Sequence, residues 1–154
     1  MQSVKSSNKI SKWLLGICLG LIFLFLYRSY INPPANERTR YKLSLLEEKL
    51  SSQGYRSWFF VCSGKRSVWY NARIGGKANS YHLSGSAIDI LVFDIDGDWK
   101  FDQKDIAILE KLNRSVEREH PELVGGFGTY RKEGGLYGFM VHLDTRGKKV
   151  RYDY

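Results

Sequence analysis

Two segments of this 154-residue chain place side chains capable of chemistry on otherwise apolar strands. Segment 87–93 is apolar at every position except Asp89, and in segment 139–144 the face opposite the apolar one carries His142 and Asp144. A carboxylate buried on such a face is costly unless it is paired, hydrogen-bonded or bound to a metal ion. The two segments therefore predict polar partners that meet inside the folded domain.

A histidine between these segments completes a candidate metal site. His82 lies seven residues before Asp89, across a bend expected at Gly85. Two histidines and one carboxylate suit zinc with an open fourth position, where a water molecule becomes a nucleophile near neutral pH. The alternative is a core aspartate capped by backbone amides beside two unrelated histidines. The third histidine, His120, precedes a proline at an expected helix end and is predicted to be a surface residue.

A second candidate ion site follows the Asp89 strand. Segment 94–105 carries acids at positions 1, 3, 5, 9 and 12 of a twelve-residue loop, a spacing that resembles the dockerin form of the EF-hand calcium loop. Trp99 departs from that pattern, because glycine normally makes the turn at position 6. The alternative is a solvated acidic loop, whereas bound calcium would make the loop rigid. The candidate ligands are Asp94, Asp96, Asp98, the carbonyl of Lys100, Asp102 and Asp105.

Alternating helical and strand patterns supply the elements that must position these residues. Helices are predicted over 37–53, 68–74 and 103–118, and strands over 58–62, 87–93, 139–144 and 150–154, of which 58–62 is expected to be buried. The last helix has a hydrophobic stripe at residues 106, 109, 112 and 116. Because helices and strands do not alternate regularly, the pattern predicts an α+β fold with a mainly antiparallel sheet and flanking helices.

The N-terminal segment predicts a membrane anchor. Residues 13–27 carry no charge and follow three lysines, which is the layout of a signal anchor with its basic tail in the cytoplasm. We expect a cytoplasmic tail over 1–12, a single transmembrane helix over 13–31, a linker over 32–40 and a domain over 41–154 outside the cytoplasmic membrane, on the periplasmic or cell-wall side. No good cleavage site follows, which favours an uncleaved anchor.

The charge distribution argues against a nucleic-acid partner. The chain has 24 lysines and arginines against 16 acidic residues, but residues 1–40 hold most of the excess. No basic stripe remains in the domain, so we expect no nucleic acid to bind. The basic segment 146–151 leaves open a weaker reading, a surface for anionic polymers or lipid, although 150–154 fits a terminal strand better.

A wider pattern resembles the M15 peptidases, the zinc D-alanyl-D-alanine carboxypeptidases and murein endopeptidases, which share their fold with the hedgehog signalling domain. The resemblance extends from about Tyr41 to the C-terminus. It is carried by the S-x-H-x-x-G-x-A-x-D element over 80–89, the preceding segment 63–76, and the distant segments 125–130 and 139–147.

The resemblance implies a role for each site residue. His82, Asp89 and His142 would bind zinc, Arg66 would hold a substrate carboxylate or oxyanion, and Ser80 would line the same site. Asp144 joins Arg66 and Ser80 as a candidate catalytic residue, with a place behind His142 as the alternative. The substrate would be a peptidoglycan stem peptide or cross-link beside D-alanine.

One departure from the family pattern keeps a second function open. Several relatives place a glutamate three residues before the last zinc histidine, where this chain has Phe139, so the general base is unassigned. The alternative function is therefore a non-catalytic cell-wall binding module on the same fold.

Overall fold

The computed structural model describes residues 13–24, 35–131 and 135–153. Residues 13–24 are helical, and the predicted tail 1–12, the remainder of the predicted anchor over 25–31 and the first part of the linker lie outside the described residues. Within the described residues, no helix is both long enough and apolar enough to cross a membrane.

A five-stranded sheet in the order β1-β2-β4-β3-β5 forms the centre of the domain. The strands are β1 (Phe59–Ser63), β2 (Ala87–Val92), β3 (Gly126–Thr129), β4 (Met140–Asp144) and β5 (Val150–Asp153). β1, β2, β4 and β3 pair antiparallel in turn, whereas β5 joins β3 in parallel. The α+β class is therefore confirmed, and the sheet is mixed, with antiparallel pairs in the majority.

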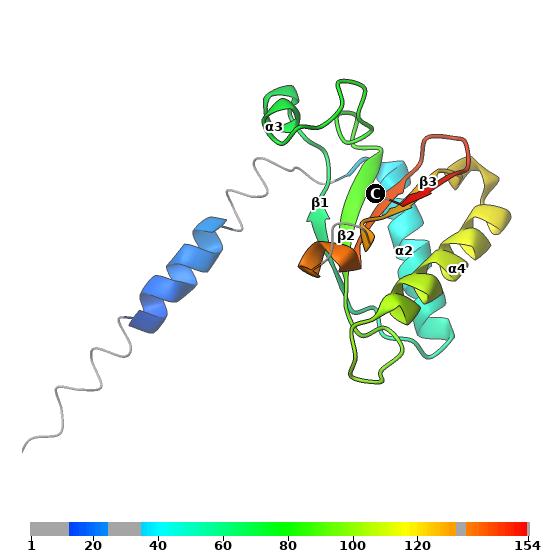
Figure 1. The fold of residues 1–154 in the computed structure, drawn as a ribbon, viewed down its shortest axis with the longest axis horizontal. Helices are drawn as coiled ribbons and strands as arrows, with labels where there is room; N and C mark the ends of the chain where they lie inside the picture. The colour runs from blue at the N-terminus through cyan, green and yellow to red at the C-terminus, as the bar shows by residue number, and fades with distance from the viewer. Residues whose placement is uncertain (1–12, 25–34, 132–134, 154) are drawn as a thin grey trace, which may run out of the picture.

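Two helices cover one face of this sheet (Figure 1). They are α2 (Glu37–Ser52) and α4 (Gln103–Glu119), which pack on each other as well as on the strands. The predicted stripe of α4 is buried throughout, with every member at most 2% exposed. Ile106, Leu109 and Leu112 of this stripe meet the apolar residues of β2 and β4 that point to the same side, so this face of the sheet is the hydrophobic core.

The ends of both helices follow from local sequence. Asn36 caps α2 by accepting a hydrogen bond from the Thr39 amide at 2.9 Å. Asp102 caps α4, and the Asp105 carboxylate accepts a hydrogen bond from the Asp102 amide, which completes a capping box. The shorter helices α3 (Val68–Arg73), η1 (Pro121–Leu123) and η3 (Gly135–Phe139) lie in the connections.

The expectation of a buried strand over 58–62 was wrong. β1 is the edge strand, and only its inward side chains Phe59 and Val61 pack against the core. Trp58 and Phe60 are 47% and 49% exposed. Segment 58–62 is apolar throughout because its outward side chains are aromatic and exposed. The hydrophobic pattern alone did not distinguish these exposed positions from core positions.

A charged network joins the helices to the sheet behind the candidate site. Lys42 of α2 is fully buried, and its ammonium group donates hydrogen bonds to Glu117 of α4 at 2.8 Å and to the Asp144 carbonyl at 3.0 Å. Glu117 also accepts a hydrogen bond from Arg151 of β5 at 2.7 Å. Burial lowers the pKa of Lys42, although its pairing with Glu117 opposes that shift. The network holds the end of β4 in place from the helical side.

Candidate active site

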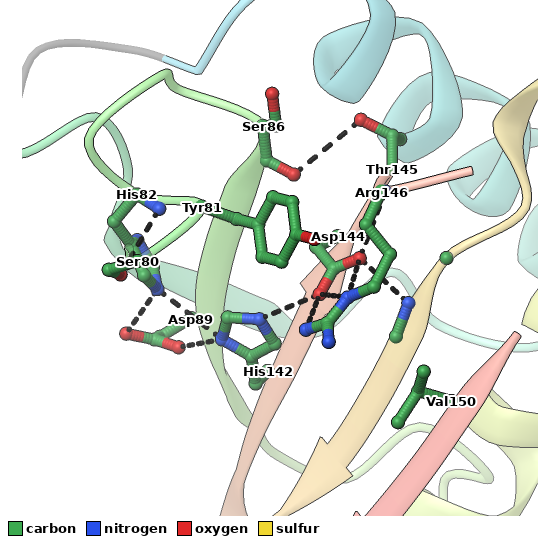
Figure 2. A network of polar contacts seen from close by, with 12 residues as sticks. Ser80, Tyr81, His82, Ser86, Asp89, His142, Asp144, Thr145, Arg146 and Val150 are labelled. Atoms are coloured by element: carbon green, nitrogen blue, oxygen red, sulfur yellow. Dashed lines mark hydrogen bonds and ion pairs between the residues drawn. The ribbon is translucent and has the colours of Figure 1, made fainter. Parts of the chain in front are cut away.

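The predicted zinc ligands converge on the sheet face that lies away from α2 and α4. Asp89 and His142 are direct cross-strand neighbours on β2 and β4, and His82 reaches them from the turn that precedes β2. His142 Nδ1 lies 3.0 Å from Asp89 Oδ1, and His82 Nε2 lies 3.3 Å from Asp89 Oδ2. All three side chains are buried, and Figure 2 shows them directed at one another. The structure therefore brings together three residues that are far apart in sequence.

The outer nitrogen of each histidine has a partner that determines which nitrogen carries the proton. His82 Nδ1 lies 2.8 Å from the Gly64 carbonyl oxygen, which can only accept, so Nδ1 is the donor. His142 Nε2 lies 3.1 Å from Asp144 Oδ2 and likewise donates. In the neutral rings, the remaining nitrogens therefore point their lone pairs at the Asp89 carboxylate and lie 3.3 Å from each other. Two lone pairs and a carboxylate at this separation fit a shared cation.

Hydrogen bonding keeps the Asp89 carboxylate ionised. Burial by itself would raise the pKa of Asp89. When no cation lies between them and the facing ring nitrogens carry protons, hydrogen bonds from His142 and His82 outweigh burial and hold the pKa of Asp89 far below its usual range. Burial would lower the pKa of His142, whereas its hydrogen bonds to Asp144 and Asp89 raise it. A metal ion requires an ionised aspartate, which this environment supplies across the physiological pH range.

Asp144 lies behind His142 rather than beside the open side of the site. Its carboxylate is fully buried and accepts hydrogen bonds from His142 Nε2, from the Gly126 amide at 2.7 Å and from Arg146 Nε at 2.9 Å. Burial would raise the pKa of Asp144, but these donors lower it well below its usual range. Of the two predicted positions, the structure favours the one that orients His142, because a carboxylate so enclosed has no open lone pair to present to a substrate.

Arg66 and Ser80 each contact a member of the His82, Asp89 and His142 group. The Arg66 guanidinium forms an ion pair with Asp89 Oδ2, and Arg66 Nε donates to Ser63 Oγ at 2.8 Å. The side chain of Arg66 is 12% exposed, so a positive charge borders the group of His82, Asp89 and His142, which we call the metal-ligand cluster. The Ser80 hydroxyl accepts a hydrogen bond from the His82 amide at 3.3 Å and supports the turn that carries this histidine.

Two further residues, Tyr130 and Arg146, contact the site, although the sequence indicated no role for either of them there. The Tyr130 hydroxyl lies 3.5 Å from Asp89 Oδ1, and Arg146 joins the site by binding Asp144 while its guanidinium lies 4.4 Å from the centre of the Tyr81 ring (Figure 2). Tyr130 belongs to the motif 125–130, and Arg146 follows the aspartate it binds by two positions. Arg146 is thus engaged within the domain.

The acidic loop gathers only part of its predicted calcium ligands. Oxygen atoms of Asp94, Asp96 and Asp98 lie within 4.8 Å of one another, and Asp94 is already paired with Arg56 at 2.7 Å. The Asp105 carboxylate has other partners: it accepts a hydrogen bond from the Ile95 amide at 2.8 Å and takes part in the capping box of α4.

The remaining members of that loop have local roles. Asp102 caps α4, and the Lys100 amide donates to Asp98 at 2.8 Å. His120 ends α4 and contacts Glu122 at 3.2 Å, away from the metal-ligand cluster. Calcium binding by this loop stays a prediction.

Comparison with known proteins identifies the family. A family model described as Peptidase M15 matches residues 39–133, more than half of the chain. The chain belongs to the M15 peptidase family. No curated protein and no solved structure matches it. The match contains Arg66, Ser80, His82 and Asp89, and the fold brings His142 of this M15 peptidase to them from beyond the matched residues. Family membership supports a hydrolase of peptide bonds.

Proposed function

We propose that this M15 peptidase is a zinc-dependent hydrolase of peptidoglycan stem peptides or cross-links, cutting beside D-alanine. The observation that carries the proposal is the convergence of His82 Nε2, His142 Nδ1 and the Asp89 carboxylate, with each outer ring nitrogen already bonded. The family suggests peptidoglycan as the substrate, and the donor set of two imidazoles and one carboxylate suits zinc.

The metal would be held by His82 Nε2, His142 Nδ1 and Asp89. A zinc ion in that position would supply Lewis-acid chemistry at the scissile carbonyl. The Gly64 carbonyl and the Asp144 carboxylate keep both rings in the tautomer that exposes the ligating nitrogen. The chain thus prepares the ligands before any metal arrives, which lowers the cost of ordering them on binding.

Two side chains beside the cluster would act on the substrate. The guanidinium of Arg66 is permanently charged and forked, which suits a terminal carboxylate or an oxygen that gains negative charge during bond cleavage. The hydroxyl of Tyr130 lies near Asp89 and is placed to donate a hydrogen bond to such an oxygen. The two groups contact different oxygens of the Asp89 carboxylate, so both lie beside the proposed metal position.

The location of the domain is a second part of the proposal. The uncharged segment 13–27 with its preceding lysines supports a single-pass anchor that leaves the peptidase outside the cytoplasmic membrane. A peptidase on that side would meet the wall peptides directly.

The test is digestion of purified cross-linked peptidoglycan by the whole chain in detergent, with the products identified by mass spectrometry. Wild type, wild type with a chelator, His82→Ala and His120→Ala would be compared, and their zinc content measured. His120→Ala is the matched control because it removes a histidine that lies outside the metal-ligand cluster. We expect the wild type and the control to contain zinc and to release products. We expect His82→Ala to do neither.

The products decide between the finer possibilities. Release of uncross-linked muropeptides would show an endopeptidase, and loss of one terminal D-alanine a carboxypeptidase. A zinc-loaded, folded wild type that releases neither would contradict the peptidase proposal for this substrate. Binding to the wall without turnover would then favour the non-catalytic module, which the presence of Phe139 in place of a glutamate would explain.

A further inference from the structure

An aromatic hollow lies at the edge of the sheet, formed by Arg56, Ser57, Trp58 and Trp99. The hollow has a volume of about 390 Å³. The two indole rings meet edge to face with 6.5 Å between their centres, and the Arg56 guanidinium lies 5.7 Å from the Trp58 ring and 5.2 Å from the Trp99 ring. Trp58 is 47% exposed and Trp99 is 77% exposed. A pair of large aromatic side chains this exposed marks an interaction surface.

The exposure of Trp99 is not a by-product of folding. Trp99 has a φ of 65°, and it is the one non-glycine residue with a positive φ among the residues that the structure describes. Its amide is held by Asp94 Oδ2 at 3.3 Å, which keeps the loop in this conformation. A bulky residue pays conformational strain there without gaining burial, and such strain points to a use outside the core.

The hollow shares a sheet face with the metal-ligand cluster. Phe59 packs into the core, so the neighbouring Trp58 is directed to the other face, where Asp89 also lies. The Trp58 carbonyl accepts from the Phe93 amide at 2.9 Å, and Phe93 follows Asp89 by four residues, about 13 Å along a strand. A polymer bound at the cluster would need to extend only a short distance to reach the indole rings.

The hollow and the residue at which the described domain begins lie at opposite ends of β2. The chain enters the domain at Asn36, whose amide donates to the Gly85 carbonyl at 2.9 Å just before β2 begins. The loop that carries Trp99 follows the opposite end of β2 (Figure 1).

We propose that the aromatic hollow binds the N-acetylated sugars of a peptidoglycan glycan strand. This proposal rests on the proposed function, because it assigns a second substrate contact to the same enzyme. Indole rings offer flat apolar surfaces for the C–H face of a sugar ring, and their N–H groups remain able to donate to its hydroxyls. Arg56 uses one nitrogen to bind Asp94 and has a side chain 43% exposed, so its other donors meet acetamido or carboxylate oxygens.

The test is binding of the whole chain in detergent to peptide-free glycan strands, measured by co-sedimentation across a concentration series. Trp99→Gly removes the ring and suits the positive φ, so it should fold, which a thermal unfolding curve checks. Trp69→Ala is the matched control, since Trp69 is 63% exposed and has an arginine 5.5 Å from its ring on α3. Trp58→Leu supplies a second variant within the hollow.

We expect Trp99→Gly and Trp58→Leu to weaken glycan binding by about tenfold, and Trp69→Ala to leave it within about twofold. Equal binding by all four proteins would overturn the proposal. The proposal would also be overturned if the wild type bound phosphatidylglycerol vesicles through Trp99 and did not bind glycan. A separate assay follows cleavage of a sugar-free cross-linked peptide by the wild type. Its failure beside Trp99-dependent glycan binding would count against the peptidase alone.

Discussion

Replacement of Asp144 by asparagine separates the two roles that its sequence position allows. The carboxylate accepts a hydrogen bond from His142 Nε2 at 3.1 Å and thereby selects the tautomer that points Nδ1 at Asp89. A hydrogen bond to a charged group contributes about 1.5–3 kcal/mol, which corresponds to about 10–100-fold in an equilibrium constant. Loss of a carboxylate behind a histidine ligand costs metal affinity by a similar factor. We therefore expect Asp144→Asn to bind zinc about 10–100-fold more weakly.

The assay is competition for zinc against a chromophoric chelator, followed by the pH dependence of hydrolysis at saturating zinc. Asp153→Asn is the matched control, because Asp153 lies on β5, which β3 separates from β4, and its side chain is 38% exposed. If Asp144 only positions His142, the acid limb of the pH–rate profile remains in Asp144→Asn once zinc is restored. Full zinc affinity combined with loss of that limb would refute this reasoning and make Asp144 the general base.

Three further outcomes follow from the buried network and the metal-ligand cluster. Lys42→Met should lower the free energy of unfolding in urea by about 3 kcal/mol, whereas Lys49→Met, which removes a solvent-screened pair with Glu119, should change it little. Burial would raise the pKa of Glu117, but hydrogen bonds from Lys42 and Arg151 lower it. The ionised Glu117 side chain therefore stabilises the fold above the ordinary glutamate pKa, and this stabilisation is lost as pH falls through the lowered pKa. Glu117→Gln should make the melting temperature depend less on pH between pH 7 and about 3. Removal of zinc by a chelator should lower the unfolding free energy by about 2.7 kcal/mol when free zinc had been 100 times its Kd, and an unchanged melting temperature would contradict metal binding to the native state.

Local patterns predicted the helices α2, α3 and α4, and they marked Asp89 and His142 as polar residues on apolar strands. The stripe along α4 was readable because each of its side chains recurs at helical spacing, and α2 begins directly after its capping residue. The strand β3 was missed, since its four residues, Gly126 to Thr129, include two glycines and carry too few side chains to show a strand period. Its second glycine is required by the fold, because a Cβ on Gly128 would lie 2.0 Å from the Tyr152 ring.

Long-range partners explain what the patterns did not show. Lys42 lies four residues before Leu46, on the face of α2 that is buried, but a lysine is rarely buried without a partner. Its partner Glu117 is 75 residues away, and the carbonyl of Asp144 is 102 residues away. A buried lysine is tolerated only where both of these partners are in place, and neither lies near Lys42 in the sequence.

The amino-acid sequence by itself determined which residue types could bind a metal and on which strands they stand, because an aspartate and a histidine on apolar strands are visible from local periodicity. Tertiary structure alone decided how they act. The pairing of β2 with β4 sets Asp89 opposite His142, and the turn before β2 adds His82. Only that packing places Asp144 behind His142 and leaves the two tryptophans exposed, since orientation and burial depend on neighbours that are distant along the chain.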